Sequence, residues 1–366
     1  MSSPRVLVIF NEPVLSPYHP DYASEVDVLD IRDDVIWILE EGNFQVESVG
    51  FSKDPAVLLD ALKSFRPDAV FNLFEGLANQ NATEISCAGL LEWMNVSFTG
   101  SSASAIALGR DKVRTKFLLQ GAGLPTPRFQ VVELKTKITW PYNWPAMVKP
   151  ITQDASVGIS QKNVVTNEKD LAEQVERIGT EYGEPVLVEE YIDGREFHIH
   201  VLEDYESGRA ASKLSLTPLI ELRFDYNNSS DLWPIYTYSA KWLDESKEFN
   251  SSFFDLPVYL EPKLMEEIQR VALGAFRCIG LRDYSRLDIR LSEKGVPYIL
   301  EVNPNPYLLS YFFQLTLEAM GRSLHEQVRD LARNALFRAG RLTDLPSRPS
   351  THLLLPTKSY RQESES

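Results

Sequence analysis

The chain has little cysteine and no long apolar run. Its 366 residues include only two cysteines, Cys87 and Cys278, so no disulfide framework is expected, and we predict two buried free thiols in a reducing compartment. The first apolar run, residues 5–10, is too short for a signal peptide, and no run reaches the roughly 18 residues that suggest a membrane span. We therefore expect a cytoplasmic protein that does not enter a membrane.

Positive charge is also scarce. Lys and Arg number 37 against 52 Asp and Glu, which gives a net charge of −15. General nucleic-acid binding is disfavoured, because no excess of cations is available to replace the counterions of a phosphate backbone. ATP is not excluded, since a few local cations and a metal are enough for one triphosphate. The sequence has neither a Walker A motif nor a GxGxxG motif after its first strand.

The length and the 43% apolar content predict two or three folded domains. Strands and helices alternate over about the first hundred residues, which indicates a small parallel α/β domain. Strands are expected there at 5–10, 44–51 and 68–73, and helices at 30–41 and 56–65. Further strands are expected at 147–150, 161–165, 186–191, 197–203 and 285–303, with helices at 103–122 (a pair), 168–178, 261–279 and near 316–339. Residues 341–366, rich in Ser, Pro and charge, are expected to form a poorly ordered tail.

Residues 285–305 (SRLDIRLSEKGVPYILEVNPN) predict an antiparallel hairpin that turns at 292–295. Pairing Leu291 with Val296 places Arg286 opposite Glu301 and Asp288 opposite Ile299. One face then carries Arg286, Asp288, Glu301 and Asn303, and the other carries Leu287, Ile289, Leu291, Val296, Tyr298, Leu300 and Val302. Two carboxylates and an amide oxygen suit Mg²⁺, which completes its shell with phosphate oxygens. The alternative is an ordinary hairpin whose charges face water.

Cations and a phosphate-binding loop are expected from other segments. Lys149 ends an apolar strand and Lys112 begins a helix, so either ammonium could hold a phosphate or lie solvated at the surface. The loop 153–160 (QDASVGIS) has small residues that let backbone N–H groups approach phosphate oxygens. His198 and His200 alternate on a strand, and exposed-face histidines are favoured over a metal pair because no third ligand is nearby.

The order of these segments resembles the D-alanine–D-alanine ligase branch of the ATP-grasp superfamily. Over residues 5–335 the matching pieces are PDAVFNLFEGL, FTGSSASAIALGRDKVRTKFLLQGAGLPTP, VKP, DASVGIS, VEEYIDGRE, AKWLDE and RLDIRL…YILEVNPN. The resemblance implies an α/β (α+β ATP-grasp) fold. Its parts would be an N-terminal parallel α/β pre-ATP-grasp domain (1–102), two α+β subdomains that clasp ATP (103–192 and 193–340) and the tail (341–366).

The resemblance also implies roles for individual residues. ATP phosphates would be held by Lys112, Lys149 and, on a mobile loop, Lys241, beneath a lid loop formed by Ser156, Val157 and Gly158. Adenine would lie against Glu189, Glu190, Tyr191 and Ile192, with the ribose on Glu196. Asp288, Glu301 and Asn303 would bind two magnesium ions, with manganese as a substitute; Arg286 would stabilise the oxyanion, and Glu25 would bind the amino group of the first substrate. The implied partners are a small carboxylate and a small amine, and a homodimer is compatible with the resemblance.

Four positions depart from the family pattern. Ala155 replaces a lid-loop serine, Trp242 a tyrosine, Glu75 a histidine and Tyr307 a glycine, and all four belong to or face the amino-acid substrates. We therefore predict an ADP-forming carboxylate–amine ligase that acts through an acyl-phosphate on substrates other than two D-alanines. The alternatives are a genuine D-alanine–D-alanine ligase, a nucleotide-binding regulatory protein without catalysis, and another kind of phosphoryl transfer. The substrates and their stereochemistry are not determined by the sequence.

Overall fold

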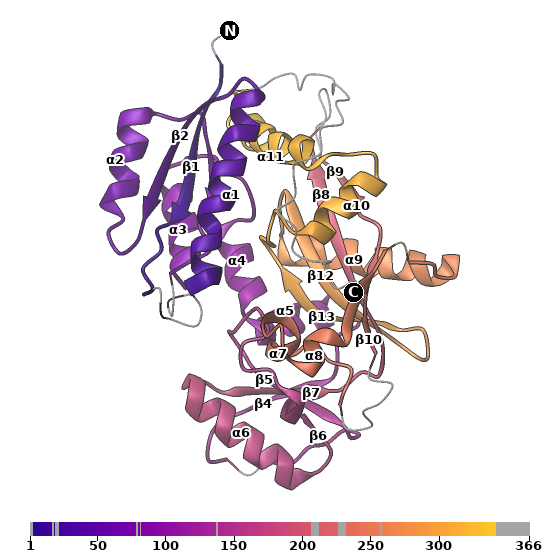
Figure 1. The fold of residues 1–366 in the computed structure, drawn as a ribbon. Helices are drawn as coiled ribbons and strands as arrows, with labels where there is room; N and C mark the ends of the chain where they lie inside the picture. Colours follow the sequence, from indigo (N-terminus) through magenta and orange to yellow (C-terminus); the bar gives the residue numbers. More distant parts are fainter. Residues whose placement is uncertain are drawn as a thin grey trace.

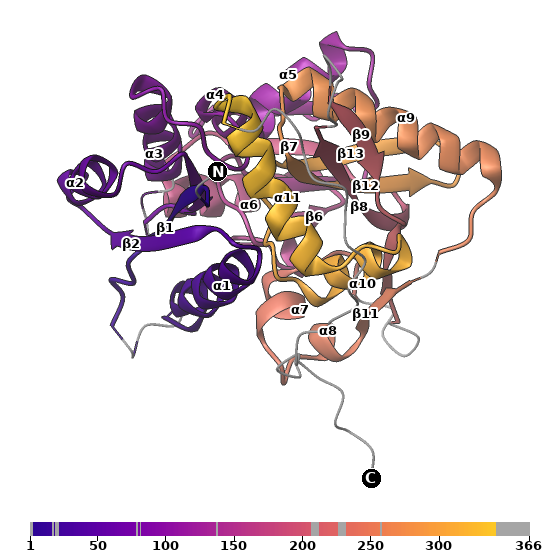
Figure 2. The ribbon, with the colours of Figure 1, turned by 90° about the horizontal axis from the view of Figure 1, so that it is seen from above.

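The computed structural model describes residues 3–16, 18, 22–77, 80, 82–136, 138–205, 212–225, 232–256 and 258–341. Apart from Arg341, the predicted tail lies outside the described residues. No helix in these ranges is long and apolar enough to cross a membrane. In these ranges the strands form three sheets, and helices pack against them (Figures 1 and 2).

The N-terminal sheet is parallel, as expected, with three strands in the order β2-β1-β3. The strands are β1 (Arg5–Asn11), β2 (Gln45–Phe51) and β3 (Ala69–Leu73). Alternate residues of β1 point to opposite faces, so Val6 and Val8 pack with α1 (Tyr22–Glu41), whereas Leu7 and Ile9 pack with α2 (Ala56–Phe65) and α3 (Ala82–Trp93). The first face is also covered by α11 (Leu324–Arg338), which returns from the far end of the sequence (Figure 2).

Two short helices lead into the second sheet. α4 (Ala103–Arg110) and α5 (Lys112–Gly121) are separated by Asp111, whose side chain accepts a hydrogen bond from the Arg114 N–H and caps α5. The antiparallel sheet has the order β4-β7-β5-β6, and α6 (Glu168–Tyr182) packs on it. Its strands are β4 (Phe129–Val132), β5 (Ala146–Pro150), β6 (Val164–Val165) and β7 (Val186–Glu190). The strand expected at 161–165 is shorter, because Gln161–Asn163 form a 3₁₀ turn.

The third sheet is built around β8 (Gly194–Asp204), which lies between β10 (Ile220–Phe224) and β12 (Tyr284–Ser292). β11 (Ser252–Asp255) and β13 (Pro297–Asn303) are the outer strands, in the order β11-β10-β8-β12-β13. β10 pairs with the first half of β8, and β9 (Lys213–Leu216) pairs with its C-terminal end. α9 (Pro262–Ile279) packs on the apolar face of this sheet. The short helices α7 (Tyr238–Trp242) and α8 (Lys247–Asn250) precede β11.

One helix had been expected near 316–339, and the structure has two. α10 (Tyr311–Ala319) ends before Gly321, whose φ of +72° suits glycine, and Ser323 then caps α11 with a capping box to Glu326. The prediction that both cysteines are buried is also only half right. Cys87 is buried in α3, whereas Cys278 on α9 is partly exposed.

The predicted register of the β12–β13 hairpin is wrong. Leu291 pairs with Pro297 rather than with Val296, and Asp288 pairs with Glu301 rather than with Ile299. The register shifts between Asp288 and Ile289, which leaves Leu300 as the extra residue of a bulge. Between the turn and the bulge, the residues of β13 therefore point to the opposite faces from those predicted. Ile299 is fully buried, whereas Tyr298 and Leu300, which were expected on the apolar face, are partly exposed.

Candidate active site

Asp288 and Glu301 lie side by side at the centre of the candidate site. They are direct partners across β12 and β13, and the amide of Asn303 donates a hydrogen bond of 3.4 Å to Asp288 Oδ2. Arg286 grips the Asp288 carboxylate with two hydrogen bonds, of 2.8 and 3.1 Å. Burial acts to raise the pKa of Asp288, but the Arg286 guanidinium outweighs it and holds that pKa far below its usual range. The predicted clustering of these four side chains is therefore present.

The oxygen ligands fit a hard divalent cation that is bound mainly by its substrate. Mg²⁺ is commonly held by one or two carboxylates plus substrate phosphates rather than by a full protein cage. No cluster of three or more His, Cys, Asp or Glu suited to a metal occurs in the described ranges. His198 Nε2 is 3.7 Å from Asp288 Oδ1. The expectation of exposed histidines is wrong, because β8 is a central strand: His198 and His200 are buried, and burial lowers the pKa of both.

Lys112, the first residue of α5, reaches the same acidic pair. Its Nζ is 3.0 Å from Glu301 Oε1 and 3.6 Å from Asp154 Oδ1, and it donates a hydrogen bond to the backbone oxygen of Gln153. Burial acts to lower the pKa of Lys112, but Glu301 and Asp154 raise it, so the side chain stays cationic. Lys112 thus links the predicted metal ligands to the loop that begins at Gln153.

Lys149 on β5 and Lys116 on α5 both pair with the buried Glu189, an arrangement that was not predicted from the sequence. The Nζ of Lys149 lies 2.7 Å from Glu189 Oε1 on β7, and the Nζ of Lys116 lies 2.6 Å from Glu189 Oε2 and 2.9 Å from Thr126 Oγ1. Burial acts against ionisation, but the two lysines lower the pKa of Glu189 to about 2. The only sequence signal for Lys116 was its spacing of four from Lys112, which puts both on one side of α5.

The segment expected to meet adenine and ribose is organised by Arg290, a second missed residue. Glu189 points to the lysines, whereas Glu190 points to the opposite face and pairs with Arg128. Arg290 donates to the backbone oxygen of Ile192 (3.0 Å) and to Glu196 Oε2 (2.9 Å). Its guanidinium also stacks on the ring of Tyr191, at 5.2 Å.

The lid loop between β5 and β6 is hydrogen-bonded to α7 and to the segment just before it. Ser156 Oγ donates a hydrogen bond to the backbone oxygen of Tyr236 (2.9 Å). The indole N–H of Trp242 donates one to the backbone oxygen of Ala155 (3.1 Å). Ala155, Ser156 and Gly158 have positive φ, so the chain coils tightly here, with Val157 between them. Lys241 lies over the Trp242 ring at 5.2 Å, and burial together with Arg286 lowers its pKa to about 8.

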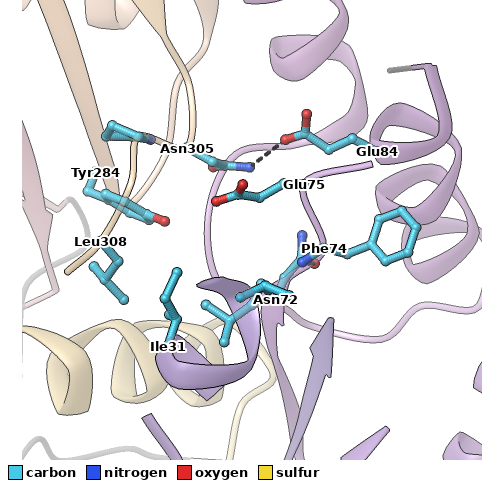
Figure 3. A pocket seen from close by; sticks show the side chains of 11 residues that line it. Ile31, Asn72, Phe74, Glu75, Glu84, Tyr284, Asn305 and Leu308 are labelled. Carbon is cyan, nitrogen blue, oxygen red and sulfur yellow. Dashed lines mark hydrogen bonds between the residues drawn. The ribbon is translucent and has the colours of Figure 1, made fainter. Parts of the chain in front are cut away.

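The expected substrate residues Glu25, Glu75 and Tyr307 come from both ends of the chain. On α1, Glu25 Oε2 accepts hydrogen bonds from the N–H groups of Val14 and Leu15, while its buried Oε1 has no partner among the described residues. The Tyr307 hydroxyl donates to Asp27 Oδ2 (2.5 Å), which joins the segment after β13 to α1. Glu75 lies in a cavity beside this connection (Figure 3).

The C-terminal part of the chain matches a known family model. Residues 118–332 match the model described as "D-ala D-ala ligase C-terminus". The chain belongs to this family. The D-alanine–D-alanine ligase family is part of the ATP-grasp superfamily, as expected, and its members are ATP-dependent, ADP-forming carbon–nitrogen ligases. The chain is an enzyme of this ligase type.

Relatives of the D-alanine–D-alanine ligase family agree in sequence and fold. An uncharacterized protein, y4sG, from Sinorhizobium fredii is 32% identical over 263 residues, 69% of this chain and 72% of that protein. A D-alanine–D-alanine ligase of Acinetobacter baumannii is 29% identical over 65% of this chain and 71% of its own. The ATP complex of the Bacillus anthracis D-alanine–D-alanine ligase and the Enterococcus faecalis VanG D-Ala:D-Ser ligase each superpose with a TM-score of 0.68 at 18% identity. The two alignments cover 92% and 91% of this chain, respectively, and 99% of each solved chain. The predicted fold class is confirmed.

Proposed function

We propose that the chain joins a carboxylate to an amine with conversion of ATP to ADP, through an acyl-phosphate, and that its substrates are not two D-alanines. One observation carries the proposal. The directly opposed Asp288 and Glu301 each hold a cation, Arg286 and Lys112, that can instead meet a phosphate or an oxyanion. A purely structural hairpin has no need of two partly buried ion pairs on one face, because removing ion pairs from water is often neutral or unfavourable for stability.

The proposed roles follow from where the side chains lie. Asp288, Glu301 and Asn303 hold Mg²⁺, as two ions, with Mn²⁺ as a substitute; the metal offsets negative charge on the phosphoryl oxygens. Lys112, Lys149 and Lys241 contact the phosphates, and the backbone of Ser156, Val157 and Gly158 closes over them. The segment Glu189, Glu190, Tyr191 and Ile192 provides backbone groups for the adenine edge, and Glu196 accepts a ribose hydroxyl.

The proposed chemistry has two steps. A substrate carboxylate oxygen attacks the γ-phosphorus of ATP, ADP leaves, and an acyl-phosphate forms. The amine then attacks the acyl carbon, phosphate leaves, and the surplus amine proton is released. Arg286 stabilises the tetrahedral oxyanion; its pKa is raised by Asp288 against the effect of burial, so it keeps its charge. A closed lid excludes water, which would hydrolyse the acyl-phosphate.

The residues expected to face the amino-acid substrates support the proposal that these substrates are not two D-alanines. The contact between Trp242 and Ala155 needs no serine hydroxyl, because the indole donates to a backbone oxygen. The Tyr307 side chain occupies space that a glycine would leave open and is anchored on Asp27. Glu25, whose Oε1 has no partner among the described residues, binds the amino group of the first substrate.

The proposal is tested with an ADP-release screen of the purified chain against pairs of amino acids and other carboxylates, with product masses. Acceptor-dependent ADP release with a mixed amide product supports it. Release that depends on D-alanine alone, with the D-alanyl dipeptide as product, contradicts the substrate assignment. The Glu301→Gln variant should be inactive, and Glu293→Gln, at the exposed hairpin turn, is the matched control.

A further inference from the structure

A row of alternating charges runs from the N-terminal domain through the lid loop to the hairpin of the candidate active site. Its members are, in order, Glu84 on α3, Arg110 at the end of α4, Asp154 in the lid loop, Lys112 on α5 and Glu301 on β13. Each side chain pairs with the next one, so ion pairs join three parts of the fold. The proposed reaction uses Lys112 and Glu301, whereas the other three members have no part in it so far.

Arg110 is the central cation of this row. Its guanidinium donates hydrogen bonds to the carboxylates of Glu84 and Asp154 from different nitrogens, and a third to the backbone oxygen of Glu75 at 3.3 Å. Glu75 and Glu84 belong to the N-terminal domain, and Asp154 belongs to the lid. The planar fork of an arginine can serve several acceptors at once, whereas a lysine ammonium is a compact point charge. Arg110 thus spans the joint between the N-terminal domain and the lid loop.

Asp154 is held by two cations, one of which has another task in the proposed reaction. Oδ2 of Asp154 accepts from Arg110, and Oδ1 lies 3.6 Å from Lys112 Nζ. When Lys112 meets a phosphate, Arg110 is the cation that still holds Asp154. Without Arg110 this carboxylate would lie beside the triphosphate with its charge unmatched, and repulsion would move it away together with the lid. The contact between Arg110 and Asp154 can therefore keep the lid in place while nucleotide is bound.

The neighbouring hydrogen bonds of the lid lead to other parts of the molecule. At its start, the Glu184 carboxylate accepts from the N–H groups of Ile151 and Thr152, at 2.7 and 3.1 Å. After Asp154, the side chain of Ser156 and the backbone oxygen of Ala155 bond to α7 and the segment just before it. These bonds fix the lid to the second sheet and to α7, and the tie to the N-terminal domain runs through Arg110.

We propose that Arg110 is a positioning residue for the ligase reaction: by holding Asp154, it keeps the lid loop against the N-terminal domain while Lys112 meets the phosphate. The assignment rests on the proposed ligase function and adds how its lid is held. A lid held in this way excludes water from the acyl-phosphate. If the contact is lost, water attacks the acyl-phosphate, the carboxylate is regenerated and phosphate leaves, so ADP is released without an amide.

Hydrogen–deuterium exchange of the full-length chain, with Mg²⁺ and the ATP analogue AMP-PNP, measures how firmly the lid segment 153–160 is held. Asp154→Asn removes the lid charge and leaves the pair of Arg110 and Glu84 intact, so this variant should fold. Arg110→Lys keeps a cation beside Glu84 but not the fork that serves both acids. Since a hydrogen bond between charged groups typically shifts an equilibrium by about tenfold or more, lid exchange should be about tenfold faster in each variant. The double variant should be no faster than the faster single variant.

Two controls separate loosening of the lid from a general loss of stability. Exchange of β8 in the third sheet should be the same in wild type and variants. Arg114→Lys makes the same change on the adjoining helix α5, where the arginine side chain is 70% exposed and pairs with Asp111. This control should behave as wild type in every measurement.

The consequence for the reaction is read from the amide formed per ADP released, with a substrate pair found in the ADP-release screen. Wild type should form about one amide per ADP, and Asp154→Asn several-fold less, while its KM for ATP changes less than this yield. Unchanged lid exchange in Asp154→Asn, equally faster exchange in β8, multiplied effects in the double variant, or an unchanged amide yield would each overturn the role of Arg110. Lid exchange that depends on Asp154, without ADP release from any pair, overturns the ligase proposal instead.

Discussion

Replacing Glu189 by glutamine should destabilise the protein far more than replacing its neighbour Glu190. Glu189 is 1% exposed and lies between Lys116 and Lys149, at 2.6 and 2.7 Å. Glutamine keeps the size of the side chain and removes its charge. The glutamine oxygen can accept a hydrogen bond from one lysine, but its NH2 group would face the other, and without the negative charge the mutual repulsion of the two lysines is no longer offset.

The magnitude follows from the pKa of Glu189, which folding lowers from 4.5 to about 2. A shift of about 2.5 units corresponds to roughly 3 kcal/mol at 1.36 kcal/mol per unit. Because the folded pKa is depressed, this contribution is fully present above pH 4.5 and is lost as the pH falls toward 2. Removal of one partner of a buried ion pair costs about 3–5 kcal/mol in other proteins, which is the same scale.

Urea unfolding followed by tryptophan fluorescence measures the loss, because Trp140 and Trp144 lie beside the same sheet. At pH 7 we expect Glu189→Gln to lower the free energy of unfolding by about 3 kcal/mol, and this difference should shrink by about 1.4 kcal/mol per pH unit below 4.5. Glu190→Gln is the matched control: its partner Arg128 is 55% exposed, so about 0–1 kcal/mol is expected. Equal losses in the two variants, or a loss in Glu189→Gln that does not change with pH, would refute the reasoning.

Three further predictions concern the site. Asp288→Asn should reduce ADP release at least about 100-fold, and Asp288→Ala should also cost about 3 kcal/mol in urea unfolding, because Arg286 loses its partner; a wild-type rate at ordinary magnesium levels would contradict the metal assignment. Glu301→Gln should abolish turnover yet tighten metal-free ATP binding in calorimetry, since it releases Lys112; weaker binding would show that Lys112 does not meet a phosphate. Tyr307→Gly should change the acceptor profile in the ADP-release screen more than the KM for ATP, and an unchanged profile would contradict its place in the pocket.

The elements and the polar face of the hairpin could be predicted from the sequence because both depend on local periodicity. The register could not, because it depends on two separate one-residue shifts. Gly295, with a φ of +74°, allows a turn that pairs Leu291 with Pro297, and the bulge at Leu300 adds the second shift. Two shifts restore the original alternation, so Asp288 and Glu301 share a face as predicted, whereas Tyr298 and Ile299, between the shifts, exchange faces.

The missed residues share a different cause. Lys116, Arg290 and Arg110 neutralise acids that lie far away in the sequence, on β7, β8 and α3. Nothing in the local pattern of a helix or strand says which distant carboxylate its cation will meet. Motif matching finds groups that touch a ligand, and these cations instead hold other protein groups in place. Only the folded arrangement reveals them.

The ion pairs of the site explain why metal and nucleotide should act together. Each acid assigned to the metal is paired with a cation of the same site: Asp288 with Arg286, and Glu301 with Lys112. Mg²⁺ alone therefore meets a Glu301 that Lys112 already neutralises, and ATP alone meets a Lys112 that Glu301 already holds. On the proposed roles, binding of both would let the lysine pair with the phosphate and the carboxylate with the metal, so that neither charge would be left unmatched. Each ligand then raises the affinity for the other by the same factor, as linkage requires. The free protein keeps these charges matched, and we expect it to bind either ligand weakly when that ligand comes alone.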